Sequence, residues 1–321
     1  MSRLRGLYDS LAARERFDLV HQTNPVDLGV TLALPRTIPP LVLGPYWSDW
    51  PHDADGALTI RRRLVGSASD QFRALVRRQE QRRAAAILLT TPAAREKVSV
   101  DGRDGAIIEV LGSGIELDAL DRAWQSGDGA PEPQSVLFLA NLRFHKGIHT
   151  LLDAFERVVV EIPDARLIVG GSGPEEDAVR ARAAGPAMCG RVEVLGAVPR
   201  SEIPSLMRRA SVFCQPAYSE PFGTSAVEAM ACRLPVVATN TGGLQFVVPP
   251  DAGVKVPPKD APALAAALVK LLTDPTARAT LGEAGRRTVE ERYAWPRVID
   301  RLDALYRDVL VRRSRPAPGV L

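Results

Sequence analysis

The sequence predicts an α/β fold of two domains, in which doubly wound helices cover parallel sheets. From residue 134 onward, short apolar runs alternate with segments of helical pattern. Such alternation is typical of parallel strands joined by crossover helices. The chain of 321 residues is also long enough for two domains that each bury a core.

The second part of the chain carries the clearer pattern. Its apolar runs predict strands at 135–140, 166–170, 192–195, 211–215 and 235–239. The stretches of helical spacing predict helices at 150–161, 175–184, 201–210, 223–232 and 261–273. We assign residues 134–290 to this second domain.

The first part is a shorter α/β domain, residues 1–117. It has strand-like runs at 17–21, 40–43 and 86–90 and an arginine-rich helical stretch at 70–85. Glycine and proline near the end of residues 118–133 predict an interdomain linker there. A terminal helix is expected at 291–313, interrupted at Pro296, and a disordered tail at 314–321.

Composition excludes several classes of protein. The net charge of +3 is too small to argue for a nucleic acid partner, and we expect none. Three cysteines lack the spacing of metal ligands, and Cys214 and Cys232 lie in apolar stretches, which favours a reducing, cytoplasmic compartment. No run is long enough to cross a bilayer, so any contact with a membrane would be peripheral, at its inner face.

The most specific motif places two carboxylates, Glu220 and Glu228, on either side of Gly223, between an apolar strand and a buried helix. The N-terminus of a helix offers unpaired N–H groups to a phosphate. A carboxylate cannot bind phosphate, but it accepts hydrogen bonds from a diol. The motif therefore suggests a nucleotide sugar. Alternatively, Ser225 and Glu228 fit a capping box, in which Glu228 only satisfies a backbone N–H.

The stretch Glu220-Pro221-Phe222-Gly223 with Glu228 resembles the E-x7-E signature of retaining, GT-B-fold glycosyltransferases, in particular glycosyltransferase family 4. Other segments lie where that family would have them, and together they cover nearly all of residues 134–313. They are Val136–Leu142 followed by Lys146-Gly147, Leu167–Pro174, Val192–Gly196, and Pro235–Ala238 before Gly242-Gly243.

The resemblance implies a GT-B-like fold of two Rossmann-like, doubly wound domains that face a cleft. The first domain is shorter than the family's usual one and begins at a segment that resembles its middle. Part of the sheet and of the acceptor pocket would then be missing. We therefore expect an apparently truncated N-terminal domain.

The resemblance also assigns roles. Lys146 would neutralise the diphosphate, Glu220 would hold hexose hydroxyls and Glu228 the ribose diol. The other expected donor contacts are Asn141, Arg143, Gly171, Gly173, Phe222, Gly223, Thr224 and Ser225. The family usually has arginine at the position of Asn141, and this chain departs from it, so Arg143 would substitute. No protein nucleophile is required.

In the first domain, His21 ends a strand, where histidines of the resembled family often face the cleft, and we count it among the catalytic candidates. A structural role is the alternative.

Trp47 is a candidate for stacking on a sugar, with a core role as its alternative. Asp53-Ala54-Asp55 resembles a metal motif of another glycosyltransferase fold but lacks its context, so we expect no metal and no required cofactor. The arginine run from Arg61 to Arg83 indicates a solvated face, or attraction to an anionic lipid or phosphorylated acceptor.

Two functions remain open. One is a retaining hexosyltransferase that moves a hexose from a nucleoside-diphosphate sugar to a hydroxyl of a glycan, lipid or small molecule. The other is a nucleotide-sugar-binding protein without transfer activity, or a partner subunit, because the first domain is short. An epimerase on the same fold is disfavoured, since the E-P-F-G signature belongs to the transferases.

Overall fold

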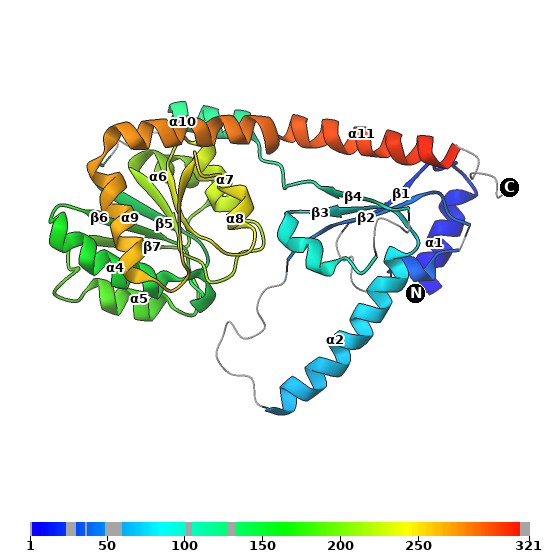
Figure 1. Ribbon diagram of the computed structural model, residues 1–321, viewed down its shortest axis with the longest axis horizontal. Coiled ribbons are helices and arrows are strands. Elements are labelled where there is room, and N and C mark those ends of the chain that lie inside the picture. The colour runs from blue at the N-terminus through cyan, green and yellow to red at the C-terminus, as the bar shows by residue number, and fades with distance from the viewer. Residues whose placement is uncertain are drawn as a thin grey trace. The chain divides into compact units, whose positions relative to one another are not determined.

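A computed structural model describes residues 2–23, 30–35, 37–48, 60–100, 105–126 and 132–314. The chain forms two compact units. Unit 1 comprises Met1–Asp49, Gly56–Gly112 and Val298–Leu321, and unit 2 comprises Trp50–Asp55 and Ser113–Arg297. Figure 1 labels their elements.

Unit 2 contains a parallel sheet of six strands in the order β10-β9-β8-β5-β6-β7. The strands are β5 (Ser135–Leu139), β6 (Arg166–Gly170), β7 (Val192–Gly196), β8 (Val212–Gln215), β9 (Val236–Thr239) and β10 (Gly253–Val256). The chain adds β6 and β7 on one side of β5, then returns to add β8, β9 and β10 on the other side. The sheet therefore has a topological switch point between β5 and β8.

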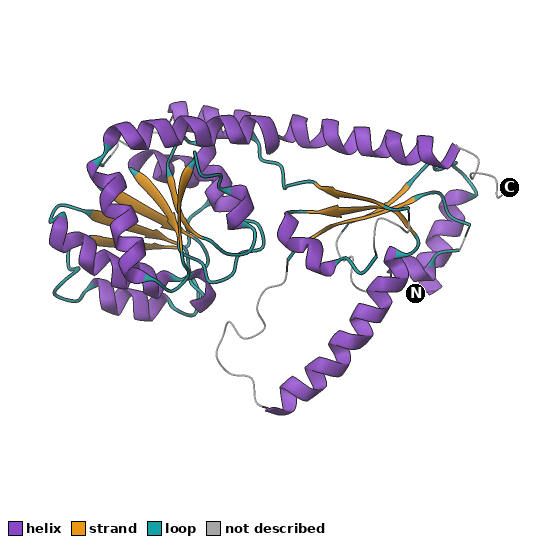
Figure 2. Ribbon diagram, viewed as in Figure 1, coloured by secondary structure: helices purple, strands orange, loops and turns teal. Residues whose placement is uncertain are grey.

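Helices cover both faces of this sheet (Figure 2). Successive residues of β5 point to opposite faces, so Leu137 and Leu139 enter one core and Val136 and Phe138 the other. The first core includes α6 (Ile203–Arg209), α7 (Thr224–Ala231), α8 (Leu244–Val247) and the end of α10 (Pro275–Arg292). The second includes α4 (Ile148–Glu161), α5 (Glu176–Ala183) and α9 (Ala261–Thr273). The expectation of a doubly wound sheet is confirmed.

Unit 1 contains a second parallel sheet, in the order β1-β2-β3-β4. Its strands are β1 (Val20–Gln22), β2 (Leu41–Tyr46), β3 (Ala84–Leu89) and β4 (Ile107–Val110). Leu41, Leu43 and Ile87 lie in the core on one face, and Val42 and Leu88 in the core on the other. The helices of this unit include α1 (Ser2–Ala12) and α2 (Ile60–Gln81), with short 3-10 turns at Val30–Ala33 and Pro92–Lys97.

The last helix, α11 (Trp295–Ser314), begins in unit 2, and from Val298 it belongs to unit 1. There Val298, Leu305 and Val309 pack on the core with Val42. A short connection separates the end of α10 from the start of α11. It is bonded to the segment before α3, because the Trp295 N–H donates to the Ile115 carbonyl at 3.2 Å. None of the described helices is long and apolar enough to cross a membrane.

The expected linker differs from the structure. Of residues 118–133, the first part is helical, within α3 (Leu117–Ser126). Leu117, Leu120 and Trp124 pack against the core of unit 2, which explains why this segment is not extended. Its glycine-rich part, residues 127–131, lies outside the described residues, as does the expected disordered tail from residue 315 onward. The units divide after Gly112 rather than after residue 117.

All three cysteines are described and none is in a disulfide. Cys214 and Cys232 are buried, and Cys189 is exposed. Burial raises the pKa of the Cys214 thiol and raises that of Cys232 to about 12, because a thiolate loses its hydration in the core.

Arg286 fixes α3 and α7 to α10. Its guanidinium donates to both carboxylate oxygens of Asp121, at 2.6 and 2.8 Å, to Glu290 at 2.6 Å and to the Ala231 carbonyl at 3.0 Å. These bonds hold the pKa of the Asp121 carboxyl below its ordinary value. The pair is therefore a source of stability that depends on pH.

We expect Asp121→Asn to lower the free energy of unfolding at pH 7 by on the order of 1 kcal/mol, since the side chain is partly exposed. A carboxyl with a lowered folded pKa stabilises the fold above its unfolded pKa, about 3.9, and this contribution is lost as the pH falls through the folded value. Urea unfolding at pH 7 and pH 3 should show a difference between wild type and variant that shrinks in acid. Asp251→Asn, on an exposed loop, is the control; a difference that persists in acid would contradict the assignment.

Candidate functional site

The candidate site lies where the loops after β5 and β8 leave the carboxyl ends of the unit 2 sheet. Ligands of such sheets bind at this edge, beside the switch point. The two loops touch: the Tyr218 N–H donates to the His145 carbonyl at 2.8 Å. At Gly147, φ is +75° and a Cβ would lie 1.9 Å from the Pro216 carbonyl oxygen, so only glycine fits there. This contact brings together residues about seventy positions apart in the sequence.

Lys146 and Glu220 form a close ion pair at this contact. The Lys146 ammonium lies 2.6 Å from Oε2 of Glu220, and the two side chains are only 12% and 8% exposed. Gln215, the last residue of β8, donates from Nε2 to the same oxygen at 3.0 Å. Both donors thus engage the same oxygen, Oε2.

Gln215 is a site residue that the sequence reasoning missed. Its Oε1 is buried and has no hydrogen-bond partner among the described residues. A Cβ on Gly223 would lie 3.7 Å from this oxygen, so it lies close to the turn that opens α7. The available signal was a polar residue at the end of the apolar run Val212-Phe213-Cys214.

Helix α7 begins without a side-chain cap. Gly223 occupies the N-cap position, Thr224 is exposed and Ser225 is half-buried. The N–H groups of Ala226 and Val227 both donate to the Gly223 carbonyl, at 3.0 and 3.1 Å. The N–H groups of Thr224 and Ser225, which precede these, have no acceptor within the helix, and such groups can bind an anion.

The capping-box alternative for Glu228 is wrong, because the helix begins at Thr224 and Ser225 is already inside it. Glu228 is 8% exposed and lines a cavity of about 450 Å³. Burial raises the pKa of its carboxyl, and the positive charge of Arg200 opposes that shift. Arg200, which the sequence reasoning also missed, lines the same cavity beside the apolar side chains Ile115, Leu120, Ile203 and Pro204.

The glycines after β6 allow two loops to pack. At Gly171, φ is +132° and a Cβ would lie 1.8 Å from the Ala140 carbonyl oxygen; at Gly173 it would lie 2.3 Å from that of Leu142. The Leu142 N–H donates to the Ser172 carbonyl at 2.9 Å. Both glycines thus lie against the backbone of the loop that carries Lys146.

Asn141 and Arg143 lie on that same loop with exposed side chains. Phe222 differs from the expectation of a donor contact. Its ring is 1% exposed and packs edge-to-face on Tyr293, with centroids 5.6 Å apart. Its side chain belongs to the core, so only its backbone could contact a donor.

His21 lies in unit 1, in the middle of β1. Its Nε2 lies 3.1 Å from the Gly44 carbonyl oxygen and its Nδ1 lies 2.6 Å from the Tyr306 hydroxyl. Since a carbonyl only accepts, Nε2 donates; in a neutral ring, Nδ1 then accepts from the hydroxyl. Burial lowers the pKa of the imidazole, and the hydrogen bond to the Gly44 carbonyl opposes this shift, so both contacts suit a neutral ring.

The side chain of Trp47 is 36% exposed. Asp53 and Asp55 lie outside the described residues.

Within the described ranges, no three His, Cys, Asp or Glu side chains form a group that could hold a metal ion.

Solved structures resemble the whole chain. Sucrose-phosphate synthase from Thermosynechococcus elongatus matches with a TM-score of 0.73 and 26% identity, over 97% of this chain and 78% of that one. HepE from Anabaena, in complex with UDP, matches with a TM-score of 0.71 and 20% identity, over 94% and 82%. With two Rossmann-like parallel sheets, these matches define the GT-B glycosyltransferase fold. A model of the family Glycosyl transferases group 1 matches residues 124–288, just over half of the chain, and the chain belongs to this family.

Curated relatives agree with the family. The D-inositol 3-phosphate glycosyltransferase of Xylanimonas cellulosilytica is 33% identical over 72% of this chain and 57% of its own length. The glycogen synthase of Mycobacterium tuberculosis is 28% identical over 66% and 53%. The phosphatidyl-myo-inositol mannosyltransferase of Mycolicibacterium smegmatis is 36% identical over 57% and 47%. The chain spans about half the length of the curated relatives it matches.

We expect Lys146→Met to destabilise the fold by about 3 kcal/mol, because it leaves the Glu220 carboxylate buried and without its cation. The double variant Lys146→Met/Glu220→Gln should recover most of that loss. Urea unfolding of both variants measures this.

Arg180→Met provides the matched control. Arg180 pairs with Glu176 at a similar distance, 2.7 Å, but with side chains that are 47% and 26% exposed. Its loss should cost less than about 1 kcal/mol. Equal effects of Lys146→Met and Arg180→Met would show that the Lys146–Glu220 pair does not behave as a buried one.

Proposed function

We propose that the protein transfers a hexose from a nucleoside-diphosphate sugar to a hydroxyl acceptor, with retention of the anomeric configuration, as expected of glycosyltransferase family 4. The observation that carries the proposal is the buried Lys146–Glu220 pair at the switch point, beside the uncapped start of α7. It combines a cation and backbone donors for phosphate with a carboxylate for hydroxyls.

The donor's diphosphate would bind between the Lys146 ammonium and the amides of Thr224 and Ser225. Charge develops on this leaving group as the bond to the sugar breaks, and donors that are already oriented stabilise it. Exposed Asn141 and Arg143 would add contacts on the same loop. The departing diphosphate would accept the acceptor's proton, so neither glutamate acts as a general base.

The two glutamates would hold the two ends of the donor. Oε1 of Glu220 would accept from hexose hydroxyls, while Lys146 and Gln215 fix the carboxylate through Oε2. Glu228 would accept from the ribose diol, and its cavity would receive the base between apolar side chains, with Arg200 as a hydrogen-bond donor. UDP and UDP-glucose, which are bound in HepE structures, support a nucleotide sugar of this kind.

In unit 1, His21 is the candidate for a hydrogen bond to a substrate hydroxyl. A neutral imidazole with Nε2–H on the Gly44 carbonyl is preoriented by two hydrogen bonds, and it could donate to a hydroxyl only if one of these bonds were exchanged.

The names of the relatives give different acceptors, so the proposal covers a glycan, a lipid or a small molecule as acceptor.

Donor binding tests the proposal. Isothermal titration calorimetry with UDP-glucose and GDP-mannose should find saturable binding, and Glu228→Gln should weaken it at least about tenfold, because one charge-assisted hydrogen bond to the ribose is lost. Glu161→Gln, an exposed carboxylate at the end of α4, is the control and should bind like wild type. Unchanged affinity in Glu228→Gln would refute the ribose role.

Retention predicts the product's anomer. With an α-linked donor and water as acceptor, proton NMR at early times should find the α-hexose before mutarotation. The β anomer as first product would overturn retention. Binding with neither transfer nor hydrolysis would instead favour the alternative of a nucleotide-sugar-binding protein or partner subunit.

We also propose that unit 1 contacts anionic membranes through α2. Phe72 and Leu75 are 67% and 57% exposed, and Arg73 and Arg78 are exposed beside them. Apolar and basic side chains on one helix surface are typical of interfacial helices.

Phe72→Ser/Leu75→Ser should reduce cosedimentation with vesicles that contain phosphatidylglycerol by at least about tenfold, since both apolar anchors are removed. Leu7→Ser/Leu11→Ser is the matched control, because these leucines are 57% and 44% exposed on α1. Binding that is equal for vesicles of phosphatidylcholine alone, or equal in both double variants, would refute this contact.

A further inference from the structure

Unit 1 contains a cavity of about 780 Å³ at the amino ends of its strands. Its lining includes Leu41 at the start of β2, Ala85 near the start of β3, and Gly105, just before β4. His21 is the middle residue of β1, and its Nε2 contacts the Gly44 carbonyl further along β2, toward the carboxyl ends of the strands. The cavity is therefore separate from the edge at which α/β sheets bind their substrates.

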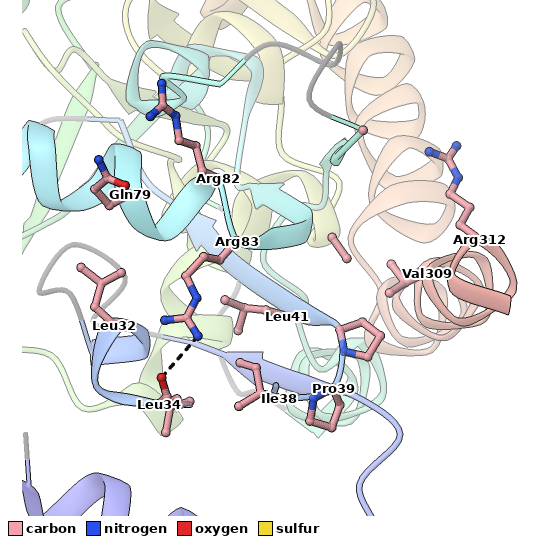
Figure 3. Close-up of a pocket in the computed structure, with 13 residues that line it drawn as sticks. Leu32, Leu34, Ile38, Pro39, Leu41, Gln79, Arg82, Arg83, Val309 and Arg312 are labelled. Atoms are coloured by element: carbon pink, nitrogen blue, oxygen red, sulfur yellow. Dashed lines mark hydrogen bonds between the residues drawn. The ribbon is translucent and has the colours of Figure 1, made fainter. Parts of the chain in front are cut away.

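One wall of the cavity is firmly built. Arg83 donates to the carbonyls of Thr31, Leu34 and Pro35 at 2.8, 3.3 and 2.8 Å, and Figure 3 shows its side chain turned toward Leu34. Thr31 is also bonded to the buried Glu80 carboxylate, which accepts from its N–H and its hydroxyl at 3.0 and 2.8 Å. The segment that carries Leu32 and Leu34 is thus held in place without any ligand.

The lining is positively charged. Among the described residues, thirteen line the cavity, and these include Arg82, Arg83 and Arg312 but no acidic side chain. Arg83 is bonded to carbonyls, which orient its charge but do not neutralise it. In the described part of the chain, the guanidinium groups of Arg82 and Arg312 make no hydrogen bond or ion pair with another residue. In Figure 3 they lie on either side of the apolar residues; Arg82 directly follows α2, and Arg312 lies near the end of α11.

The rest of the lining is apolar. Leu32, Leu34, Ile38, Leu41 and Val309 supply hydrocarbon surface between the arginines. A free phosphate would use the charge but leave this surface in contact with water. A ligand that matches both parts carries an anionic group joined to a hydrocarbon chain.

The cavity also continues the exposed face of α2. Gln79 and Arg82 line it, and they follow Phe72 and Leu75 at helical spacing of three and four residues. An amphiphile that reaches this face would meet exposed apolar side chains first and the arginine rim next. This continuity favours a membrane phospholipid over a soluble phosphate ester.

We propose that this cavity binds one molecule of an anionic phospholipid, with its phosphate at Arg82, the charge of Arg312 across the cavity adding to the attraction, and the first carbons of an acyl chain along Leu32, Ile38 and Val309. The site is distinct from the donor site of unit 2 and does not rest on the proposed transferase activity. Its ligand is bound as a single molecule, independently of vesicle binding through Phe72 and Leu75.

The test uses the full chain and water-soluble dihexanoyl-phosphatidylglycerol below its micelle concentration, titrated by calorimetry. Saturable binding of about one lipid per chain is expected. Arg82→Gln/Arg312→Gln should weaken it roughly tenfold or more, since charge-assisted hydrogen bonds to the phosphate are lost. Arg14→Gln/Arg16→Gln removes two exposed arginines elsewhere in unit 1 and should change nothing.

Further titrations distinguish the contribution of the phosphate charge to affinity from that of the hydrocarbon chain. Dihexanoyl-phosphatidylcholine should bind much more weakly, and so should glycerol 3-phosphate. Leu32→Gln, at a side chain 37% exposed and thus tolerant of substitution, should weaken phosphatidylglycerol without changing the binding of UDP-glucose to unit 2. Absence of phosphatidylglycerol binding, equal binding of either comparison ligand, or wild-type affinity in Arg82→Gln/Arg312→Gln would overturn the proposal.

Discussion

The pairing of β5 with β8 is the constraint on which the candidate site depends. Both strands run in the same direction, and the chain changes the side on which it extends the sheet between β7 and β8. The loops that follow β5 and β8 consequently emerge next to each other, and the backbone bond from Tyr218 to His145 fixes their spacing. Lys146 and Glu220 meet because of this order of strands, although 74 residues separate them in sequence.

The site also concentrates features that weaken a fold. Burial of an ion pair costs more solvation than an apolar pair of similar volume would. Next to it, Gln215 has a buried oxygen without a partner in the described structure, and α7 starts without a side-chain cap. Elsewhere in unit 2 the strands alternate cleanly between two apolar cores. Local departures of this kind that gather in one place are typical of sites selected for function rather than stability.

Sequence pattern predicted most of the unit 2 sheet because its strands are short apolar runs that end in glycine or polar turns. Sequence pattern did not predict the elements whose secondary structure depends on tertiary contacts. The short strands Ile107–Val110 and Gly253–Val256 contain Glu109 and Lys255, and their periodicity gives no clear strand signal. Residues 118–126 were assigned to a linker from glycine and proline further along, whereas an apolar stripe packs them on unit 2 as a helix.

The site residues divide in the same way. Lys146, Glu220, Gly223 and Glu228 were expected from motifs, and the structure brings Lys146 and Glu220 into contact at the start of α7. Phe222 stands within the same motif but belongs to the core, because a motif does not distinguish side chains that face a ligand from those that support the turn. Gln215 and Arg200 could not be selected in advance, since their role depends on which loops the fold places together.

The burial of Cys214 and Cys232 has a practical consequence for reagent chemistry. A thiol reacts with maleimides as its thiolate, and neither buried sulfur forms one readily near neutral pH. Cys189, just after α5, is the exposed member of the three. The folded wild-type chain therefore offers one accessible attachment point for a fluorophore or spin label, on unit 2, without the removal of native cysteines.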